Sequence, residues 1–199
     1  MDRGLTWEPQ VSDVCRRVTN TLRALYRFKH FLPASTKTLL IQALVLPVID
    51  YSDVCLTNLS QGLLDRLDRL LNSCIRFIFG LRKYDHVSAF RRKLNWLRVR
   101  ERRCLRVLCM LYSILNDPAI PEYLRSKFQF VTAQPGRELR SSRKLTLSVP
   151  LYRSGSMTNS FTMYAIRLWN SLPLEIRQSQ TKTLFKYKLR RHLLEKSLS

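Results

Sequence analysis

The chain has 199 residues, of which 45% are hydrophobic, so it can build an ordinary buried core and global disorder is not expected. Lysine and arginine number 35 against 14 aspartate and glutamate, and the resulting net charge of +21 indicates a polyanionic partner, with nucleic acid the first candidate. No apolar run is long enough to span a bilayer, and the N-terminus MDRGLTWEPQ lacks the apolar region of a secretory signal. We therefore expect an intracellular protein, in the nucleus or the cytoplasm, that is neither secreted nor bound to a membrane.

The first quarter of the chain predicts two helices. Pro9 suits the first turn of a helix whose apolar residues recur at helical spacing from residue 11 to residue 26, and we expect Pro33 to end it. Ser35 is a natural N-cap for the second helix, which Pro47 should kink or end. The expected buried face of this second helix includes Leu39, Leu40, Ala43 and Leu44.

The next segment gives the clearest helical pattern, with Ser60 as N-cap and Gly80 as the C-terminal stop. A shorter helix over 87–94 and a longer one over 99–115 follow, and the sequence Asn-Asp-Pro at 116–118 closes the longer helix. Together these patterns predict a mostly α-helical bundle over residues 9–127.

Helical periodicity is then lost. Residues 128–159 are rich in polar and basic residues and predict an irregular basic linker or arm, in which Leu145, Leu147 and Val149 alternate as a short extended segment that ends at Pro150. Helical patterns resume at Ser160 and again at Thr181, so we expect two C-terminal helices in residues 160–199.

Basic residues gather in three groups. A charged face is usually only solvated, but solvated faces mix signs, and Glu101 alone opposes the basic residues of the first group. We therefore expect these groups to contact a phosphate backbone, with Arg102, Arg103 and Arg106 as the first candidates because they share one helix face. The first group comprises Arg91, Arg92, Lys93, Arg98, Arg102, Arg103 and Arg106; the arm supplies Arg140, Arg143 and Lys144, and the terminal helix supplies Lys186, Arg190 and Arg191.

The sequence indicates no catalytic, metal or cofactor site. The five cysteines include no C-x-x-C pair, and we expect buried free thiols. Asp50-Tyr51-Ser52-Asp53 departs from the Tyr-x-Asp-Asp hairpin of polymerases and follows a helical pattern, so we interpret it as a polar helix end. With 5 glycines in the chain, a glycine-rich phosphate loop is not expected.

The order of several short motifs resembles the C-terminal part of the reverse transcriptases of non-LTR (LINE, jockey-like) retrotransposons. The matching segments are DRGLTW at 2–7, LPVIDY at 46–51, LLNSCIRFIFG at 70–80, LNWLRVRERR at 94–103, PEYL at 121–124 and LWNSLP at 168–173, followed by Ile176-Arg177 and Phe185-Lys186. In the LWNSLP motif we expect Trp169 and Leu172 to be buried, Asn170 to pair with local backbone groups, and Pro173 to end one helix and start the next.

This resemblance implies that residues 1–8 are the end of a palm, that 9–127 are a helical thumb-like domain, and that 160–199 form the C-terminal segment. It implies binding to RNA, DNA or their hybrid, with the palm of a full-length reverse transcriptase as a further partner. The family's catalytic residues lie in segments that would precede Met1, so the chain as it stands is expected to be non-catalytic. Two alternatives are a helical protein-interaction module, which exposed Leu63, Leu67 or Leu193 would favour, and a non-functional remnant of a mobile element.

Overall fold

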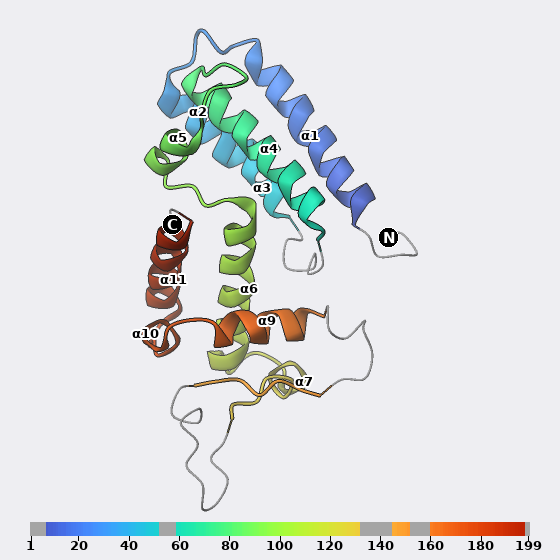
Figure 1. Cartoon of the computed structure of the whole chain (residues 1–199), viewed down its shortest axis with the longest axis vertical. Coiled ribbons are helices and arrows are strands. Elements are labelled where there is room, and N and C mark those ends of the chain that lie inside the picture. Colours follow the sequence, from blue (N-terminus) through green and yellow to red (C-terminus); the bar gives the residue numbers. More distant parts are fainter. Residues whose placement is uncertain (1–6, 52–58, 132–144, 152–159, 198–199) are drawn as a thin grey trace, which may run out of the picture. The chain divides into compact units, whose positions relative to one another are not determined.

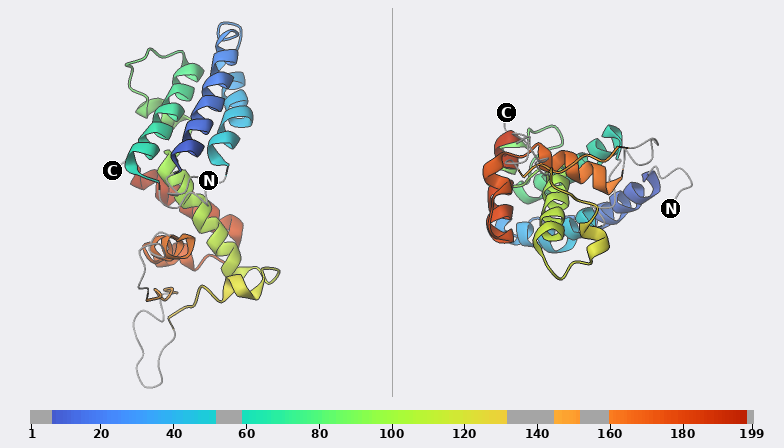
Figure 2. Two further views of the ribbon diagram at one scale, coloured as in Figure 1. Left: turned by 90° about the vertical axis from the view of Figure 1, so that its right-hand side faces the viewer. Right: turned by 90° about the horizontal axis from the view of Figure 1, so that it is seen from below.

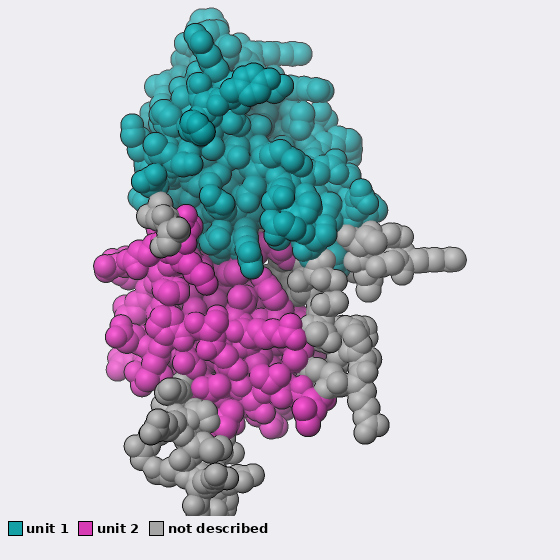
Figure 3. Space-filling model, viewed as in Figure 1, with its two compact units in different colours: residues 1–102 teal, residues 103–199 magenta. Residues whose placement is uncertain are grey.

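The computed structural model of the chain describes residues 7–51, 59–131, 145–151 and 160–197. These residues are mostly helical, which confirms the predicted fold class. The chain divides into two compact units, residues 1–102 and 103–199, which Figure 3 colours separately. The division falls inside helix α6 (Val99–Asn116), and so within the range 9–127 that we expected to form one bundle.

The first unit contains α1 (Glu8–Tyr26), α2 (Ala34–Leu40), a π-helical turn (Ile41–Val45), α3 (Leu46–Asp50), α4 (Gln61–Phe79) and α5 (Ser88–Lys93) (Figure 1). Helix α1 packs beside α4, and α2 and α3 complete the group (Figure 2). Residues 11, 14, 18 and 22 of α1 are all buried, because they recur at the spacing that keeps one face of a helix toward its partner.

Both predicted ends of α4 are confirmed. The Ser60 hydroxyl accepts a hydrogen bond from the Leu63 amide at 3.4 Å, which satisfies a donor that the first helical turn leaves unpaired. At the other end Gly80 has a φ of 67°, a left-handed conformation that glycine adopts without the penalty of a Cβ.

Two predicted boundaries in the first unit are wrong. Helix α1 ends at Tyr26 rather than near Pro33, and Tyr26 is also where α1 packs edge-to-face on Phe77 of α4, at 5.1 Å between ring centroids. Helix α2 begins after Pro33 rather than Ser35, because the extended Pro33 already offers its carbonyl to the Lys37 amide and closes the first turn.

The predicted buried face of the second helix is also wrong. Leu39 and Leu44 are 64% and 47% exposed, and Ala43 is exposed as well. Ala43 and Leu44 lie in the π-helical turn, whose wider winding does not follow regular α-helical spacing, whereas Leu39 precedes the turn in α2. The regular helix is interrupted just before Pro47, as expected, although the chain remains helical on both sides. The residues that this segment does bury are Ile41, Val45, Leu46 and Ile49.

The second unit contains most of α6, then α7 (Glu122–Arg125), α9 (Phe161–Asn170), α10 (Leu174–Arg177) and α11 (Lys182–Lys196). The two C-terminal helices that we expected are α9 and α11, and the short α10 between them begins directly after Pro173, where a helix start was predicted. Within the predicted extended segment, the described residues form one isolated bridge, between Leu147 and Phe130, rather than a strand.

An aromatic cluster positions α11 in the second unit. Phe185 of α11 is fully buried and stacks on Tyr112 of α6 and on Trp169 of α9, at 4.5 and 5.8 Å between centroids. The Tyr112 hydroxyl donates to the Ser179 carbonyl at 2.7 Å. These contacts fix the rotation of α11 about its own axis, and therefore determine which of its residues face solvent.

Candidate nucleic-acid interface

Helix α11 presents a basic surface to solvent. Its buried residues are residues 185, 189 and 193, which recur every four residues along one side. The other side is exposed, and we define the α11 basic face by five residues: Lys182, Lys186, Tyr187, Arg190 and Arg191. Glu195, the one acidic residue of the helix, accepts a hydrogen bond from Arg191 at 3.0 Å, so part of the Arg191 charge is balanced within the helix.

Tyr187 adds an aromatic ring to this face and is 66% exposed. It lies one helical turn before Arg190 and Arg191, so its phenol stands beside cations. Rings among phosphate-binding cations are what single-stranded nucleic acids stack on. We did not predict Tyr187 from the sequence, although its place between Lys186 and Lys188 could have indicated it.

Three residues of the first predicted group are exposed in the first unit: Arg92, Lys93 and Arg98. Arg92 and Lys93 end helix α5, where positive charge also favours the helix dipole. The Lys93 ammonium lies 5.4 Å from the centre of the Phe90 ring, a cation–π contact that leaves the residue exposed. These three side chains can reach a phosphate without any change in the fold.

Arg91 differs from its neighbours because it is half-buried. Its guanidinium donates a hydrogen bond to the Asn72 side chain of α4. Burial lowers the pKa of Arg91, and the Asp68 carboxylate acts in the opposite direction. Asp68 also accepts the Val99 amide at 3.1 Å and so caps the start of α6. The first role of Arg91 is therefore structural, since it joins α5 to α4.

The three arginines of α6 do not form the open basic face that we expected. Arg102 donates to both carboxylate oxygens of Asp50, at 3.1 and 2.5 Å, and the two side chains are only 17% and 15% exposed. Arg103 is 4% exposed, and Arg106 is half-buried. Asp50 is the last residue of α3, so the predicted polar helix end has a structural role as the partner of Arg102.

The arm residues of our prediction, Arg140, Arg143 and Lys144, lie outside the described residues, as does Asp53. The exposed candidates for phosphate contact are therefore those of α11, those at the end of α5, and Arg98.

The LWNSLP motif forms a packing corner. Trp169 and Leu172 are 1% and 5% exposed, α9 ends at Asn170, and Pro173 precedes α10, all as expected. Asn170 pairs with backbone, but not with the local backbone that we predicted. Its side-chain oxygen accepts the Leu147 amide and its nitrogen donates to the Leu147 carbonyl, each at 2.9 Å, because folding brings that distant segment beside the end of α9.

Two further hydrogen-bond donors of the same corner bind the carbonyl of residue 145. The Trp169 indole donates to the Leu145 carbonyl at 2.9 Å, and the buried Arg177 donates to that carbonyl at 3.3 Å. Burial also lowers the pKa of Arg177. On the other side, the amides of residues 131 and 148 donate to the carbonyls of residues 146 and 129. The motif therefore fixes residues 145–148 against α9, which is a structural role.

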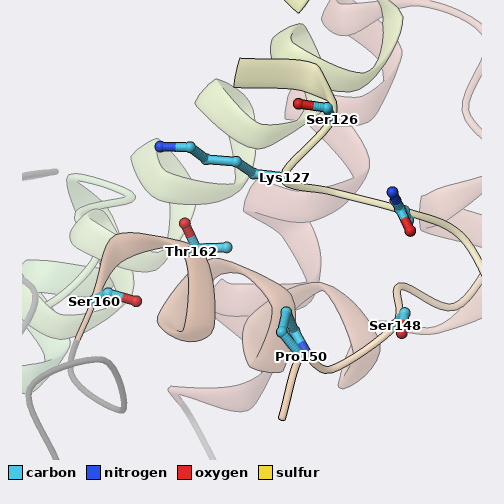
Figure 4. Close-up of a pocket in the computed structure, with 7 residues that line it drawn as sticks. Ser126, Lys127, Ser148, Pro150, Ser160 and Thr162 are labelled. Carbon is cyan, nitrogen blue, oxygen red and sulfur yellow. The ribbon is translucent and has the colours of Figure 1, made fainter. Parts of the chain in front are cut away.

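A pocket of about 550 Å³ lies in the second unit (Figure 4). Apart from Pro150, its lining residues carry hydroxyl, amide and ammonium groups: Ser126, Lys127, Gln129, Ser148, Ser160 and Thr162. At the start of α9, the Ser160 hydroxyl on the pocket wall already accepts the Met163 amide at 3.4 Å. None of these lining residues supplies a carboxylate, imidazole or thiol, so they offer no acid–base pair.

Burial makes three thiols less acidic. It raises the pKa of Cys15 and Cys109, and that of Cys74 to about 12. Cys74 is buried as expected, but Cys15, Cys104 and Cys109 are only partly buried. Each of these three lies at the margin of an apolar core beside a polar side chain: Arg66 for Cys15, Tyr164 for Cys104 and Lys186 for Cys109.

Within the described ranges, no group of three or more histidine, cysteine or acidic side chains is placed to hold a metal ion. No helix in this part of the chain is long and apolar enough to cross a membrane. A scan against protein-family models, a search of curated proteins and a search of solved structures each found no match to this chain.

Proposed function

We propose that this chain binds nucleic acid through phosphate contacts, and that it is the thumb and C-terminal segment of a non-LTR retrotransposon reverse transcriptase without polymerase activity of its own. The binding part rests on the α11 basic face. The ancestry part rests on the order of the sequence motifs alone. RNA, DNA and their hybrid all offer the phosphates that such a surface would bind.

The orientation of α11 is the observation that carries the binding proposal. Because Phe185 stacks on both Tyr112 and Trp169, the side chains of Lys186 and Arg190 are exposed to solvent one turn apart. Each can approach a phosphate of one backbone without unfolding of the helix. The strong excess of basic residues in the whole chain supplies long-range attraction to the same ligand.

The salt dependence of binding tests this proposal. We would measure the affinity of the full chain for a fluorescent RNA/DNA hybrid over a range of salt concentrations, and compare the variants Lys186→Gln and Arg190→Gln. The affinity falls as the salt concentration rises. For each residue that neutralises a phosphate, its substitution should make the slope of log K against log salt less steep by about 0.9. Lys127→Gln, which removes one exposed charge elsewhere in the second unit, is the matched control and should leave the slope unchanged. Equal slopes for wild type and both α11 variants would remove this face from the interface.

The ancestry has its own test. Sequencing of full-length transcripts would show whether the open reading frame continues upstream of Met1 into a palm with Tyr-x-Asp-Asp. An in-frame palm would support the assignment, whereas an unrelated upstream domain would refute it. This result does not depend on whether the purified chain binds nucleic acid.

The protein-interaction alternative lacks the observation that would favour it. Leu67 and Leu193 are buried, and Leu63 packs against the core of the first unit. Nucleic-acid binding is therefore the first hypothesis.

A further inference from the structure

The turn that joins α1 to α2 exposes aromatic rings among cations. We define the aromatic turn as residues 26–31, Tyr-Arg-Phe-Lys-His-Phe. Phe28 is 56% exposed and Phe31 is 83% exposed, although phenylalanine is among the residues most often buried in proteins. In Figure 1 this turn is the blue loop between α1 and α2.

The aromatic turn has a defined backbone. The Phe28 amide donates to the Leu25 carbonyl and the Phe31 amide donates to the Phe28 carbonyl, both at 3.0 Å. A hydrogen bond between residues three apart brings their Cα atoms to within about 7 Å. Phe28 and Phe31 are therefore neighbours in space, and the fold presents them together.

One side of the turn is anchored to the first unit. The Tyr26 ring packs on Phe77 at 5.1 Å between centroids, and the Lys37 ammonium lies 5.7 Å from the centre of the same Phe77 ring. Neither Phe28 nor Phe31 has an aromatic or cationic partner of this kind among the described residues. Two exposed rings thus extend from an ordered turn beside a packed anchor.

The charged residues that neighbour these rings in the sequence are all basic. Arg27 and Lys29 are exposed beside the two phenylalanines, and the sequence from residue 14 to residue 49 contains no acidic residue. A partner that covers the rings must therefore carry negative charge as well as flat or apolar surface. Unpaired nucleotides meet both conditions, because each base has a π-face and each phosphate a negative charge.

We propose that the aromatic turn is a stacking site for the unpaired bases of single-stranded nucleic acid, with Phe28 and Phe31 as the stacking rings. The inference rests on the proposed nucleic-acid binding and adds a preference for single strands. A duplex already stacks its bases on one another, so it offers phosphates to the cations but no free base face to the rings. The site differs from the α11 basic face, which carries one exposed ring, Tyr187, and whose proposed contacts are to phosphates.

The test compares single- and double-stranded ligands. We would titrate the full chain into fluorescein-labelled oligothymidylate of about 16 nucleotides, the upper range of known single-strand sites, and into a duplex of equal length. The variant is F28L/F31L, which keeps two exposed apolar side chains but removes both π-faces. Its control is L39A/L44A, which removes apolar surface from two other exposed positions of the same unit. Thermal unfolding followed by circular dichroism would check that both variants fold.

We expect F28L/F31L to bind oligothymidylate about tenfold more weakly or worse, from the typical contribution of aromatic stacking, and to bind the duplex like wild type. L39A/L44A should leave both affinities unchanged. Unchanged single-strand affinity in F28L/F31L, with duplex binding intact, would overturn the stacking site while the proposed function stands. A wild-type chain that binds neither ligand would overturn both.

A parallel titration with vesicles of phosphatidylcholine and phosphatidylserine tests whether the aromatic turn binds an anionic lipid surface instead of single-stranded nucleic acid. If F28A/F31A loses vesicle binding while F28L/F31L keeps both vesicle and single-strand binding, the turn contacts lipid and the stacking site is refuted. Loss of single-strand binding in F28L/F31L without a change in vesicle binding supports it.

Discussion

Asn170 should be one of the most sensitive positions of the second unit. Its amide side chain forms the two hydrogen bonds to Leu147 that a neighbouring peptide group would form in a β-sheet, each at 2.9 Å. Leu147 is 1% exposed, so water has little access to replace the lost partner. Asn170→Ala would therefore leave one donor and one acceptor without this partner, at about 1–3 kcal/mol each, and we expect a total loss of about 3 kcal/mol.

Urea unfolding followed by circular dichroism measures this loss, and hydrogen exchange at the Leu147 amide reports it locally. Ser171→Ala is the matched control, because it removes one exposed local hydrogen bond to the Leu168 carbonyl and should change stability by no more than about 0.5 kcal/mol. Asn170→Asp tests the mechanism, since a carboxylate accepts the Leu147 amide but repels its carbonyl. If Asn170→Ala is no more destabilising than Ser171→Ala and exchange at Leu147 is unchanged, the reasoning is wrong.

Two further predictions concern the first unit. Arg102→Ala should lower the free energy of unfolding by about 2 kcal/mol, because it leaves the mostly buried Asp50 carboxylate without this partner. The control, Arg98→Ala, changes an exposed residue and should be nearly neutral. Equal unfolding midpoints for the two variants would contradict the structural role of Arg102. For Cys74, burial raises the pKa from 9.0 to about 12, so its contribution to stability is complete below pH 9 and is lost progressively as the pH rises toward 12, because the unfolded chain ionises first. Between about pH 9 and 11, wild type should lose roughly 1 kcal/mol per pH unit more than Cys74→Ala in urea titrations, and parallel curves would refute this cause.

The helices of the first unit could be predicted largely from local signals. Ser60 and Gly80 fix the ends of α4 through chemistry within one helical turn, and the spacing of apolar residues in α1 selects its buried face. The second helix could not be predicted in the same way. A π-helical turn depends on how neighbouring helices accommodate one extra residue, and Leu44, which lies within this turn, is exposed.

The basic residues show a similar limit. The sequence identifies the charges but not their partners, because Asp50 and Arg102 are far apart along the chain. Our first candidates for phosphate contact were Arg102, Arg103 and Arg106, and the structure places Arg102 in an ion pair and buries Arg103. The exposed basic residues of α11 and α5 are therefore the better candidates for substitution.

By itself, the sequence determined the helical class, the ends of α4, the sign of the charge and the burial of Trp169 and Leu172. These properties depend on composition and on contacts within a few residues. The tertiary structure alone decided that Asn170 pairs with Leu147 and that Arg102 is bound by Asp50. It also decided that the two phenylalanines of the aromatic turn are exposed together. Each of these depends on residues that only folding brings together or keeps apart, and such distances are not encoded in any local pattern.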